Sequence, residues 1–519
     1  MIYLLPHTVS NSAKTFPNRK AFRFGSKSLT FKEIEVKMNQ LANLLHQIGI
    51  KQGDRIGIYL NRSLETAIAI YGIMQAGAIY VPLDPKVPVE RTKFLINDCG
   101  IRILITNNFQ NKNIQNIVDS GVDLDAIVGI LSAGNIPTFS WENLTEYPSS
   151  FTLPFKVLGA DVAYIIYTSG STGNPKGIMH THASGLAYAR LTAELYDLKE
   201  TDVFGNHAPI YFDISTLGFF TAPFVGGCTV IASDAHTIMP ASLSQLIEKE
   251  KITVWYSVPL ALIQLLQNGM LEEKNMSNLR WVLYAGEPCP PKYLRQLMSI
   301  WEHVKFSNIY GPTELNQCTF YNLPGSPLGE ESIPLGKTWN NTESILIDEK
   351  DQEIKSGVGE LCVRSATMMK GYWQKPKLTE ASFYRRKNNL NLTDVFYRTG
   401  DLVRLDGENT LHFLGRIDHQ VKIRGYRVEL GSIESKLVSH DAVEEAVVLA
   451  VRKKEENLEL EAIVILEPNR KVTTAELILF LKHRLPSYAI PEKIEFVASF
   501  PRTGSGKVKR SELKEILYS

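Results

Sequence analysis

Apolar runs of strand length alternate with amphipathic helical stretches through the first two thirds of the chain. A strand is predicted where a short apolar run is bounded by turn residues, and a helix where apolar residues recur every three or four positions. The alternation predicts an α/β fold with buried, largely parallel strands, because such strands carry apolar residues on both faces. The predicted strands are residues 54–60, 101–106, 161–168, 253–258 and 279–287, and the predicted helices are residues 63–77, 241–251 and 260–269.

The pattern changes after about residue 345, where strand pairs replace the strand–helix alternation. Residues 344–364 and 402–416 are predicted to form hairpins, the second with its turn at Asp406 and Gly407. This part of the chain therefore predicts a β-rich subdomain attached to the α/β core.

The last section of the chain has strands of its own and a helix that opens with Thr473 and Glu476, the spacing of a capping box. We place a domain boundary at Asp418, within the polar stretch GRIDHQ. The sequence thus predicts an N-terminal domain of residues 1–417 and a C-terminal domain of residues 418–519.

Composition limits the class of protein. With 519 residues, 44% hydrophobic residues and a net charge of +1, the chain is typical of a globular enzyme of several structural units, and nothing favours nucleic acid or an anionic membrane as its partner. We expect no signal peptide, because the first residues have no basic segment and only a short apolar one, and no apolar run reaches the roughly 18 residues of a spanning helix. We expect a cytoplasmic protein with reduced, mostly buried thiols, because the five cysteines are widely spaced: Cys99, Cys228, Cys289, Cys318 and Cys362.

Residues 167–177 read YTSGSTGNPKG and directly follow the apolar run DVAYII. Glycines in such a loop let backbone N–H groups converge on one point, which makes a nest for an anion. The hydroxyls and Lys176 add donors and positive charge, so we favour a loop that wraps nucleotide phosphates over a polar surface loop. The P-loop of kinases is excluded, because Lys176 is followed by Gly177 rather than by Ser or Thr.

Eight motifs in order resemble those of the adenylate-forming superfamily, which includes the adenylation domains of nonribosomal peptide synthesis, acyl-CoA synthetases and luciferases. The resemblance covers nearly the whole chain. It implies a large N-terminal domain with parallel-rich sheets and a β-barrel-like subdomain, and a small, mobile α+β C-terminal domain. The motifs are QAGAIYVPLDP (75–85), YTSGSTGNPKG (167–177), YFDIS (211–215), YGPTE (310–314), GELCVRS (359–365), YRTGDL (397–402), GRIDHQVKIRGYRVEL (415–430) and PRTGSGKVKR (501–510).

The resemblance implies ATP and Mg²⁺ as cofactors and assigns a nucleotide site. Tyr310 would stack on adenine, Asp401 would accept both ribose hydroxyls, and Arg416 would lie behind the ribose and phosphate. The full set implied to bind ATP is Thr168, Ser169, Gly170, Ser171, Thr172, Gly173, Lys176, Gly286, Glu287, Tyr310, Gly311, Asp401 and Arg416.

The resemblance also implies catalytic residues. Thr313 would hydrogen-bond the α-phosphate, and Glu314 would bind the Mg²⁺ ion on the phosphate oxygens. Lys507 would bridge the substrate carboxylate and the α-phosphate. Lys509 stands where the family usually has an acid, which changes the charge around Lys507. His207 matches the gate between two functional states, and Asp418 matches the hinge.

Asp213 matches the aspartate that pairs with the substrate ammonium in members that activate amino acids, and acyl and aryl ligases generally lack it. The pocket implied around it is mostly aliphatic, which argues against acidic, basic and large aromatic substrates. It resembles that of stand-alone proline-activating proteins, although Ser257 and Gln317 depart toward polarity. A proline, a modified proline or another small neutral amino acid all fit this pocket. Its lining is Asp213, Ile214, Leu217, Ser257, Leu283, Ala285, Ile309, Gln317 and Cys318.

The acyl acceptor is expected to come from another molecule. The chain ends twelve residues past Lys507, and no [LIV]-G-G-x-S carrier motif follows it. We expect a discrete carrier protein with a phosphopantetheine thiol, and free CoA is the alternative. The competing interpretations are an acyl or aryl ligase and an ATP-binding regulatory module without chemistry. Asp213 argues against the ligase, and Lys507, Glu314 and Asp401 argue against the module.

Overall fold

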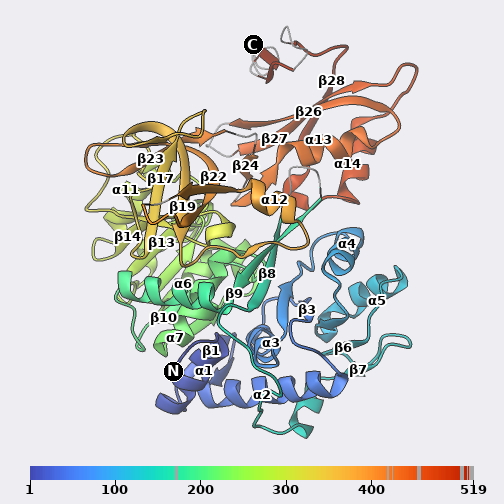
Figure 1. Ribbon diagram of the computed structural model, residues 1–519, viewed down its shortest axis with the longest axis vertical. Helices are drawn as coiled ribbons and strands as arrows, with labels where there is room; N and C mark the ends of the chain where they lie inside the picture. The colour runs from blue at the N-terminus through green and yellow to red at the C-terminus, as the bar shows by residue number, and fades with distance from the viewer. Residues whose placement is uncertain are drawn as a thin grey trace. The chain divides into compact units, whose positions relative to one another are not determined.

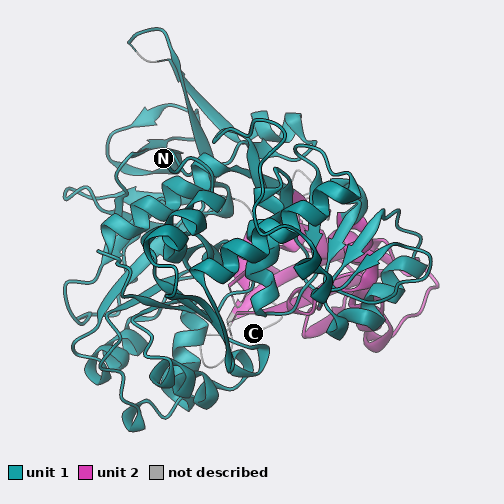
Figure 2. Cartoon of the chain, turned by 90° about the horizontal axis from the view of Figure 1, so that it is seen from below, with its two compact units in different colours: residues 1–85, 96–167, 177–417 teal, residues 86–95, 168–176, 418–519 magenta. Residues whose placement is uncertain are grey.

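The chain divides into two compact units (Figure 2). The computed structural model describes the chain apart from residues 170–173, 388, 418–419, 424, 453–457, 503–507, 511 and 514–519. Unit 1 consists of residues 1–85, 96–167 and 177–417, and unit 2 of residues 86–95, 168–176 and 418–519. The main division lies at position 418, and two short segments from earlier in the chain also belong to unit 2.

A nine-stranded sheet in the described part of unit 1 carries parallel strands at its centre and antiparallel strands at both ends. Its two faces are covered by separate apolar clusters, as expected for buried parallel strands. The strand order is β16 (Lys337–Thr338), β15 (Thr319–Asn322), β14 (Lys305–Tyr310), β13 (Trp281–Ala285), β12 (Val254–Ser257), β10 (Val203–Asn206), β11 (Cys228–Ile231), β1 (Lys20–Phe24) and β2 (Lys27–Thr30).

An eight-stranded sheet, also formed by described residues, is packed against the first three helices through one large apolar cluster. Figure 1 shows β8 and β9 side by side in this sheet. The order is β20 (Gly371–Tyr372), β9 (Lys176–Thr181), β8 (Val162–Thr168), β4 (Ile79–Pro82), β3 (Arg55–Ile58), β5 (Ile103–Ile105), β6 (Ala126–Val128) and β7 (Thr138–Phe139).

The predicted β-rich subdomain is a six-stranded antiparallel sheet, counted over the described residues. The order is β18 (Glu353–Ile354), β17 (Thr342–Ile347), β19 (Gly357–Ser365), β22 (Thr393–Leu405) and β21 (Phe383–Lys387), with β23 (Leu411–Arg416) paired to β22. The turn between β22 and β23 contains Asp406 and Gly407, as predicted. This sheet brings Asp401 directly opposite Arg416.

Unit 2 is an α+β unit. Its described strands form a hairpin of β24 (Gln420–Ile423) and β25 (Tyr426–Glu429), and a sheet of β26 (Val443–Arg452), β27 (Leu458–Leu466) and β28 (Lys493–Phe496). One apolar cluster joins these strands to α13 (Leu430–Val438) and α14 (Thr474–Lys482). Thr473 and Glu476 form the predicted capping box at the start of α14.

Some helices of the remaining chain begin at a residue whose side chain caps them. For example, Thr30 and Glu33 form a capping box at the start of the second helix, and Gly49 ends it with a φ of 97°. The helices are α1 (Pro6–Thr15), α2 (Phe31–Ile48), α3 (Leu64–Gln75), α4 (Val89–Cys99), α5 (Asn111–Asp119), α6 (His182–Leu195), α7 (Ala222–Val225), α8 (Asp234–Ile238), α9 (Pro240–Lys249), α10 (Pro259–Asn268), α11 (Pro291–Ile300) and α12 (Pro376–Ala381).

The α/β class and each strand and helix predicted from the apolar pattern are confirmed, with bounds shifted by a few residues at most. All five cysteines lie in the described part of the chain, where they are buried and form no disulfide. Among the described helices, none combines the length and the apolar character that crossing a bilayer requires.

Candidate active site

The carboxylate of Asp401 joins the residues predicted to hold the nucleoside. Its Oδ1 accepts a hydrogen bond from Arg416 Nη1 at 2.6 Å, and its Oδ2 accepts one from the hydroxyl of Tyr310. The side chain of Asp401 is only 6% exposed, so this ion pair is held largely away from water. The structure therefore places an aromatic ring, an acid and an arginine together, which suits a base and a ribose bound side by side.

Gly311 follows Tyr310 at a point where two backbone segments meet. A Cβ atom at this position would lie 2.5 Å from the Cα of Gln317 and 2.9 Å from the carbonyl oxygen of Asn316. These neighbours are backbone atoms and cannot move aside like a side chain, so the close approach requires glycine. Gly286 follows β13 directly and precedes Glu287. Its φ of 106° lies in the left-handed region, which favours glycine.

The turn that contains Thr313 and Glu314, η6 (Thr313–Leu315), is buried and held on several sides. The hydroxyl of Tyr372 donates to Glu314 Oε1 at 2.8 Å, and the N–H of Met369 donates to the Glu314 carbonyl at 2.7 Å. His180 contacts the Thr313 carbonyl at 2.8 Å. The two predicted residues are thus neighbours on a fixed turn directly after Tyr310.

A divalent ion at Glu314 fits the donor chemistry found here. Among the described residues, no group of three or more acidic, histidine or cysteine side chains is arranged to hold a metal. Mg²⁺ commonly takes one or two carboxylates and completes its shell with phosphate oxygens and water. A single buried carboxylate is therefore a suitable protein ligand for an ion that arrives on a nucleotide.

The predicted phosphate loop is described only at its two ends, both in unit 2. The hydroxyl of Ser169 donates to the carbonyl of Arg427 at 2.6 Å, and Lys176 is buried at the start of β9. Thr168 is the last residue of β8. Gly170, Ser171, Thr172 and Gly173 lie outside the described residues, as do the predicted hinge Asp418 and the predicted catalytic Lys507.

One face of the nine-stranded sheet gathers most of the predicted amino-acid pocket. Leu283 and Ala285 alternate along β13, and Ile309 lies opposite Ala285 on β14. Ile214 and Leu217 belong to the same apolar cluster and come from the short helical turns η3 (Asp213–Ser215) and η4 (Leu217–Thr221). The structure therefore brings these five aliphatic side chains together.

Ser257 does not share this face, which revises the predicted lining. In β12, Tyr256 pairs with Leu283 and belongs to the same cluster, whereas Ser257 pairs with Tyr284. The hydroxyl of Ser257 instead accepts a hydrogen bond from the indole of Trp255 at 3.0 Å, on the opposite face. Successive side chains of a strand point to opposite faces, so Tyr256 takes the place predicted for Ser257. The predicted lining, which was mostly aliphatic, thus gains an aromatic residue on this face.

Gln317 and Cys318 occupy different surroundings. The amide Nε2 of Gln317 donates to the hydroxyl of Tyr256, which places Gln317 beside the apolar face. Cys318 is fully buried with its Sγ 3.6 Å from the Tyr310 carbonyl, and it packs with the neighbouring cluster that contains Tyr310. Cys318 therefore lies on the nucleoside side of the predicted pocket.

Asp213 begins the turn η3 and is partly buried. Its charge acts on three buried hydroxyls, those of Tyr164, Tyr188 and Tyr256. Burial raises the pKa of each tyrosine, and the nearby carboxylate raises it further. A partly buried carboxylate near these tyrosines suits a cationic group of a ligand, because a buried charge is stabilised by an opposite one.

His207, the predicted gate, is partly buried beside the ring of Trp255, with 5.7 Å between the ring centroids. Burial and the charge of Arg62 lower the pKa of His207 to about 3, so the imidazole is neutral near pH 7. The guanidinium of Arg62 donates to the backbone carbonyl of His207 and forms an ion pair with Asp234 at 3.3 Å. Arg62 therefore fixes the backbone at this position.

Four residues that contact predicted site residues were not predicted from the sequence, namely Arg62, His180, Tyr256 and Tyr372. Tyr256 was detectable only from the strand register, and the other three act through contacts with residues distant in the chain.

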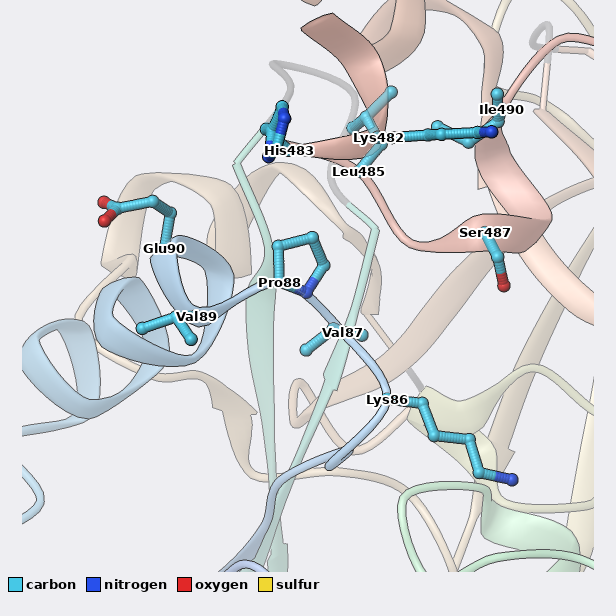
Figure 3. Close-up of a pocket in the computed structure, with 10 residues that line it drawn as sticks. All are labelled: Lys86, Val87, Pro88, Val89, Glu90, Lys482, His483, Leu485, Ser487 and Ile490. Carbon is cyan, nitrogen blue, oxygen red and sulfur yellow. The ribbon is translucent and has the colours of Figure 1, made fainter. Parts of the chain in front are cut away.

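A separate cavity of about 630 Å³ lies in unit 2, between the loop before α4 and the turn after α14 (Figure 3). It is lined by Lys86, Val87, Pro88, Val89, Glu90, Lys482, His483, Leu485, Ser487 and Ile490, and by none of the predicted site residues.

Two family profiles and several known proteins match this chain along most of its length. The profile of the AMP-binding enzyme family matches residues 9–373, and that of the AMP-binding enzyme C-terminal domain matches residues 432–507. The L-proline–[L-prolyl-carrier protein] ligase of Pseudomonas fluorescens is 30% identical over 514 residues, which is 98% of both chains. Bacitracin synthase 1 of Bacillus licheniformis is 34% identical over 96% of this chain, which corresponds to 9% of that protein.

A solved structure is also similar along nearly the whole chain. Holo-PA1221, described as an NRPS protein containing adenylation and PCP domains, has a TM-score of 0.83 and 25% identity, and the match covers 99% of this chain and 84% of that one. Together with the two family profiles and the relative matched over 98% of its length, this similarity shows that the chain belongs to the AMP-binding enzyme family.

Proposed function

We propose that this AMP-binding enzyme activates an amino acid, with L-proline as the favoured substrate, and transfers it to a carrier protein. The amino-acid carboxylate attacks the α-phosphorus of ATP, pyrophosphate leaves, and an aminoacyl-adenylate remains. The phosphopantetheine thiol of a separate carrier protein then attacks the acyl carbonyl, and AMP leaves. The first step needs a site that holds a zwitterion beside a nucleotide, and the second needs the ammonium of the adenylate to stay bound while the thiol attacks.

The position of Asp213 carries this proposal. Its charge raises the pKa of the buried Tyr256, and its chain neighbour Ile214 packs with Leu283, Ala285 and Ile309. The next strand position after Ile309 is Tyr310, whose hydroxyl contacts Asp401. Ile214, the residue after Asp213, packs in the same cluster as Ile309, so an ammonium on Asp213 and a ribose on Asp401 would be bound near consecutive residues of β14. An acyl or aryl acid has no ammonium and would leave the carboxylate of Asp213 without that partner.

Proline is favoured by the aliphatic lining and by the relative from Pseudomonas fluorescens, an L-proline–[L-prolyl-carrier protein] ligase at 30% identity. The same relative, together with the adenylation and PCP protein among the solved structures, supports a carrier protein as the acceptor. Tyr256 adds a hydroxyl to the pocket, so a hydroxylated or methylated proline remains within the proposed substrate class.

Charge neutralisation is assigned to two residues. Glu314 would hold Mg²⁺ bound to ATP, and the ion would supply Lewis-acid stabilisation of the phosphate charge. Lys507 would contact the substrate carboxylate and the α-phosphate as the two anions approach. His207 and Asp418 are proposed as the gate and the hinge of the step that follows adenylation.

Exchange of labelled pyrophosphate into ATP, dependent on an added acid, tests the proposal. We expect L-proline to give the highest rate among the twenty standard amino acids. Exchange with a fatty or aryl acid alone would instead identify an acyl or aryl ligase, and no exchange with any acid would identify a module without this chemistry. The variant Lys507→Ala should lose exchange while its circular dichroism spectrum is unchanged, and a normal rate would exclude Lys507 from catalysis.

A further inference from the structure

His180 lies on β9, 133 residues before Thr313, and is 1% exposed. Its Nε2 is 2.8 Å from the Thr313 carbonyl oxygen, and its Nδ1 is 3.3 Å from the hydroxyl oxygen of Ser184. A carbonyl oxygen only accepts hydrogen bonds, so Nε2 must carry the proton. The contact therefore selects one tautomer of His180 and uses its N–H to hold the backbone of the turn η6.

A ladder of rings fixes the orientation of this imidazole. His180 stacks on Tyr164 with 5.0 Å between centroids and 14° between planes, and Tyr164 stacks on Tyr80 at 5.4 Å and 15°. The three rings come from β9, β8 and β4, which are neighbours in the eight-stranded sheet. Stacked rings on adjacent strands leave the imidazole little freedom to rotate, so its N–H points to one place.

The imidazole stays neutral in these surroundings. Burial lowers the pKa of His180 to about 4, although the Thr313 carbonyl and the charge of Glu314 act in the opposite direction. A neutral ring keeps the acceptor lone pair on Nδ1 and the single donor on Nε2. The hydrogen bond to Thr313 is thus maintained across the ordinary pH range of enzyme assays.

We propose that His180 is a positioning residue for the nucleotide: its N–H fixes the Thr313 carbonyl and so the placement of Thr313 and Glu314 toward the phosphates. The inference rests on the proposed roles of these two residues in binding ATP and Mg²⁺. Glu314 is already held from the other side by Tyr372, which donates to its Oε1 at 2.8 Å. With His180 removed, the Thr313 carbonyl keeps the N–H of Asn316 from within the same turn, and its contact with β9 is lost, while Tyr372 and Met369 still hold Glu314.

Kinetic constants of acid-dependent pyrophosphate exchange, measured on the full chain, test this role. His180→Leu removes the N–H while retaining an apolar side chain, and we expect kcat to fall about 10- to 100-fold, because displacements of about 1 Å at reacting groups have effects of this size. The KM for the amino acid should stay within about 2-fold of its value in the unmodified chain, because His180 does not bind the amino acid. His180→Gln carries an N–H at a similar reach and should recover at least half of the loss on a logarithmic scale.

Two further variants keep the test decisive. Tyr80→Phe lies in the same ring ladder but one strand further away, so its kcat should stay within about 2-fold of that of the unmodified chain. If His180→Leu does not fold, His180→Met replaces it as the donor-free variant. A lowered melting temperature with unchanged kcat in the donor-free variant would overturn the proposal, as would a His180→Gln variant that is as slow as His180→Leu. Absence of exchange in the unmodified chain would instead refute the proposed function. In that case the affinity of each variant for Mg·ADP, measured by calorimetry, would still test the role of His180. We expect weaker binding of Mg·ADP only in the donor-free variants.

Discussion

Tyr256→Phe tests the side of the sheet on which the amino acid is bound. The substitution keeps the aromatic ring and removes only the hydroxyl that accepts from the Gln317 amide. Gln317 is 3% exposed, so its amide would lose a partner in a place that water does not reach. An unsatisfied buried group of this kind costs about 1–3 kcal/mol, and each 1.4 kcal/mol is a factor of ten in an equilibrium constant.

We therefore expect the free energy of unfolding of Tyr256→Phe to fall by about 1–3 kcal/mol in urea titrations. The KM for the amino acid should rise about 5- to 100-fold, because the released amide belongs to the lining, while the KM for ATP stays near its original value. The matched control is Ser257→Ala on the opposite face, which removes the hydrogen bond from Trp255 and should lower stability without changing either KM. A rise in the amino-acid KM for Ser257→Ala, with none for Tyr256→Phe, would refute the assignment of faces.

Three other substitutions or conditions give clear expectations. Asp213→Asn should raise the KM for the amino acid about 10- to 150-fold through loss of a charged hydrogen bond of about 1.5–3 kcal/mol, and an equal rise in the KM for ATP would contradict its pairing with the ammonium. Gly311→Ala places a Cβ 2.5 Å from a backbone atom and should lower the free energy of unfolding by about 1–3 kcal/mol, so an unchanged melting temperature would show that the turn yields. The pKa values of His180 and His207 are lowered from 6.5 to about 4 and about 3 by burial, so the unfolded chain binds more protons and the free energy of unfolding should fall as the pH drops from about 6.5 toward 4. Denaturant titrations at pH 7, 5.5 and 4.5 would detect this fall, and His180→Leu should reduce it.

The strands and helices of the core were predictable because each type has its own period of apolar residues. The face on which a given side chain lies was not, as β12 illustrates. Residues 253–258 read TVWYSV, and a strand buried on both faces shows no alternation between apolar and polar positions. Only the pairing of Tyr256 with Leu283 resolves the face, and pairing is a property of the folded sheet.

The residues of the predicted nucleotide site could be found from the sequence, but the residues that support them could not. Tyr310, Asp401 and Arg416 stand in recognisable motifs, and the structure brings them into contact. Tyr372 and His180 reach the turn η6 from 58 and 133 residues away, through the pairing of β20 with β9 and the place of β9 in its sheet. Contacts between residues so far apart depend on the order of the strands in the sheet, and the sequence around each residue does not indicate that order.

We propose that a zwitterionic amino acid is held by its ammonium at Asp213 while the nucleotide's ribose is held at Asp401. A crystal structure of the chain with a non-hydrolysable prolyl-adenylate analogue measures both contacts at once. We expect the amine nitrogen about 2.7–3.2 Å from a carboxylate oxygen of Asp213 and the ribose hydroxyls at similar distances from Asp401. An analogue bound with its amine directed away from Asp213, toward another acid or toward solvent, would contradict the account.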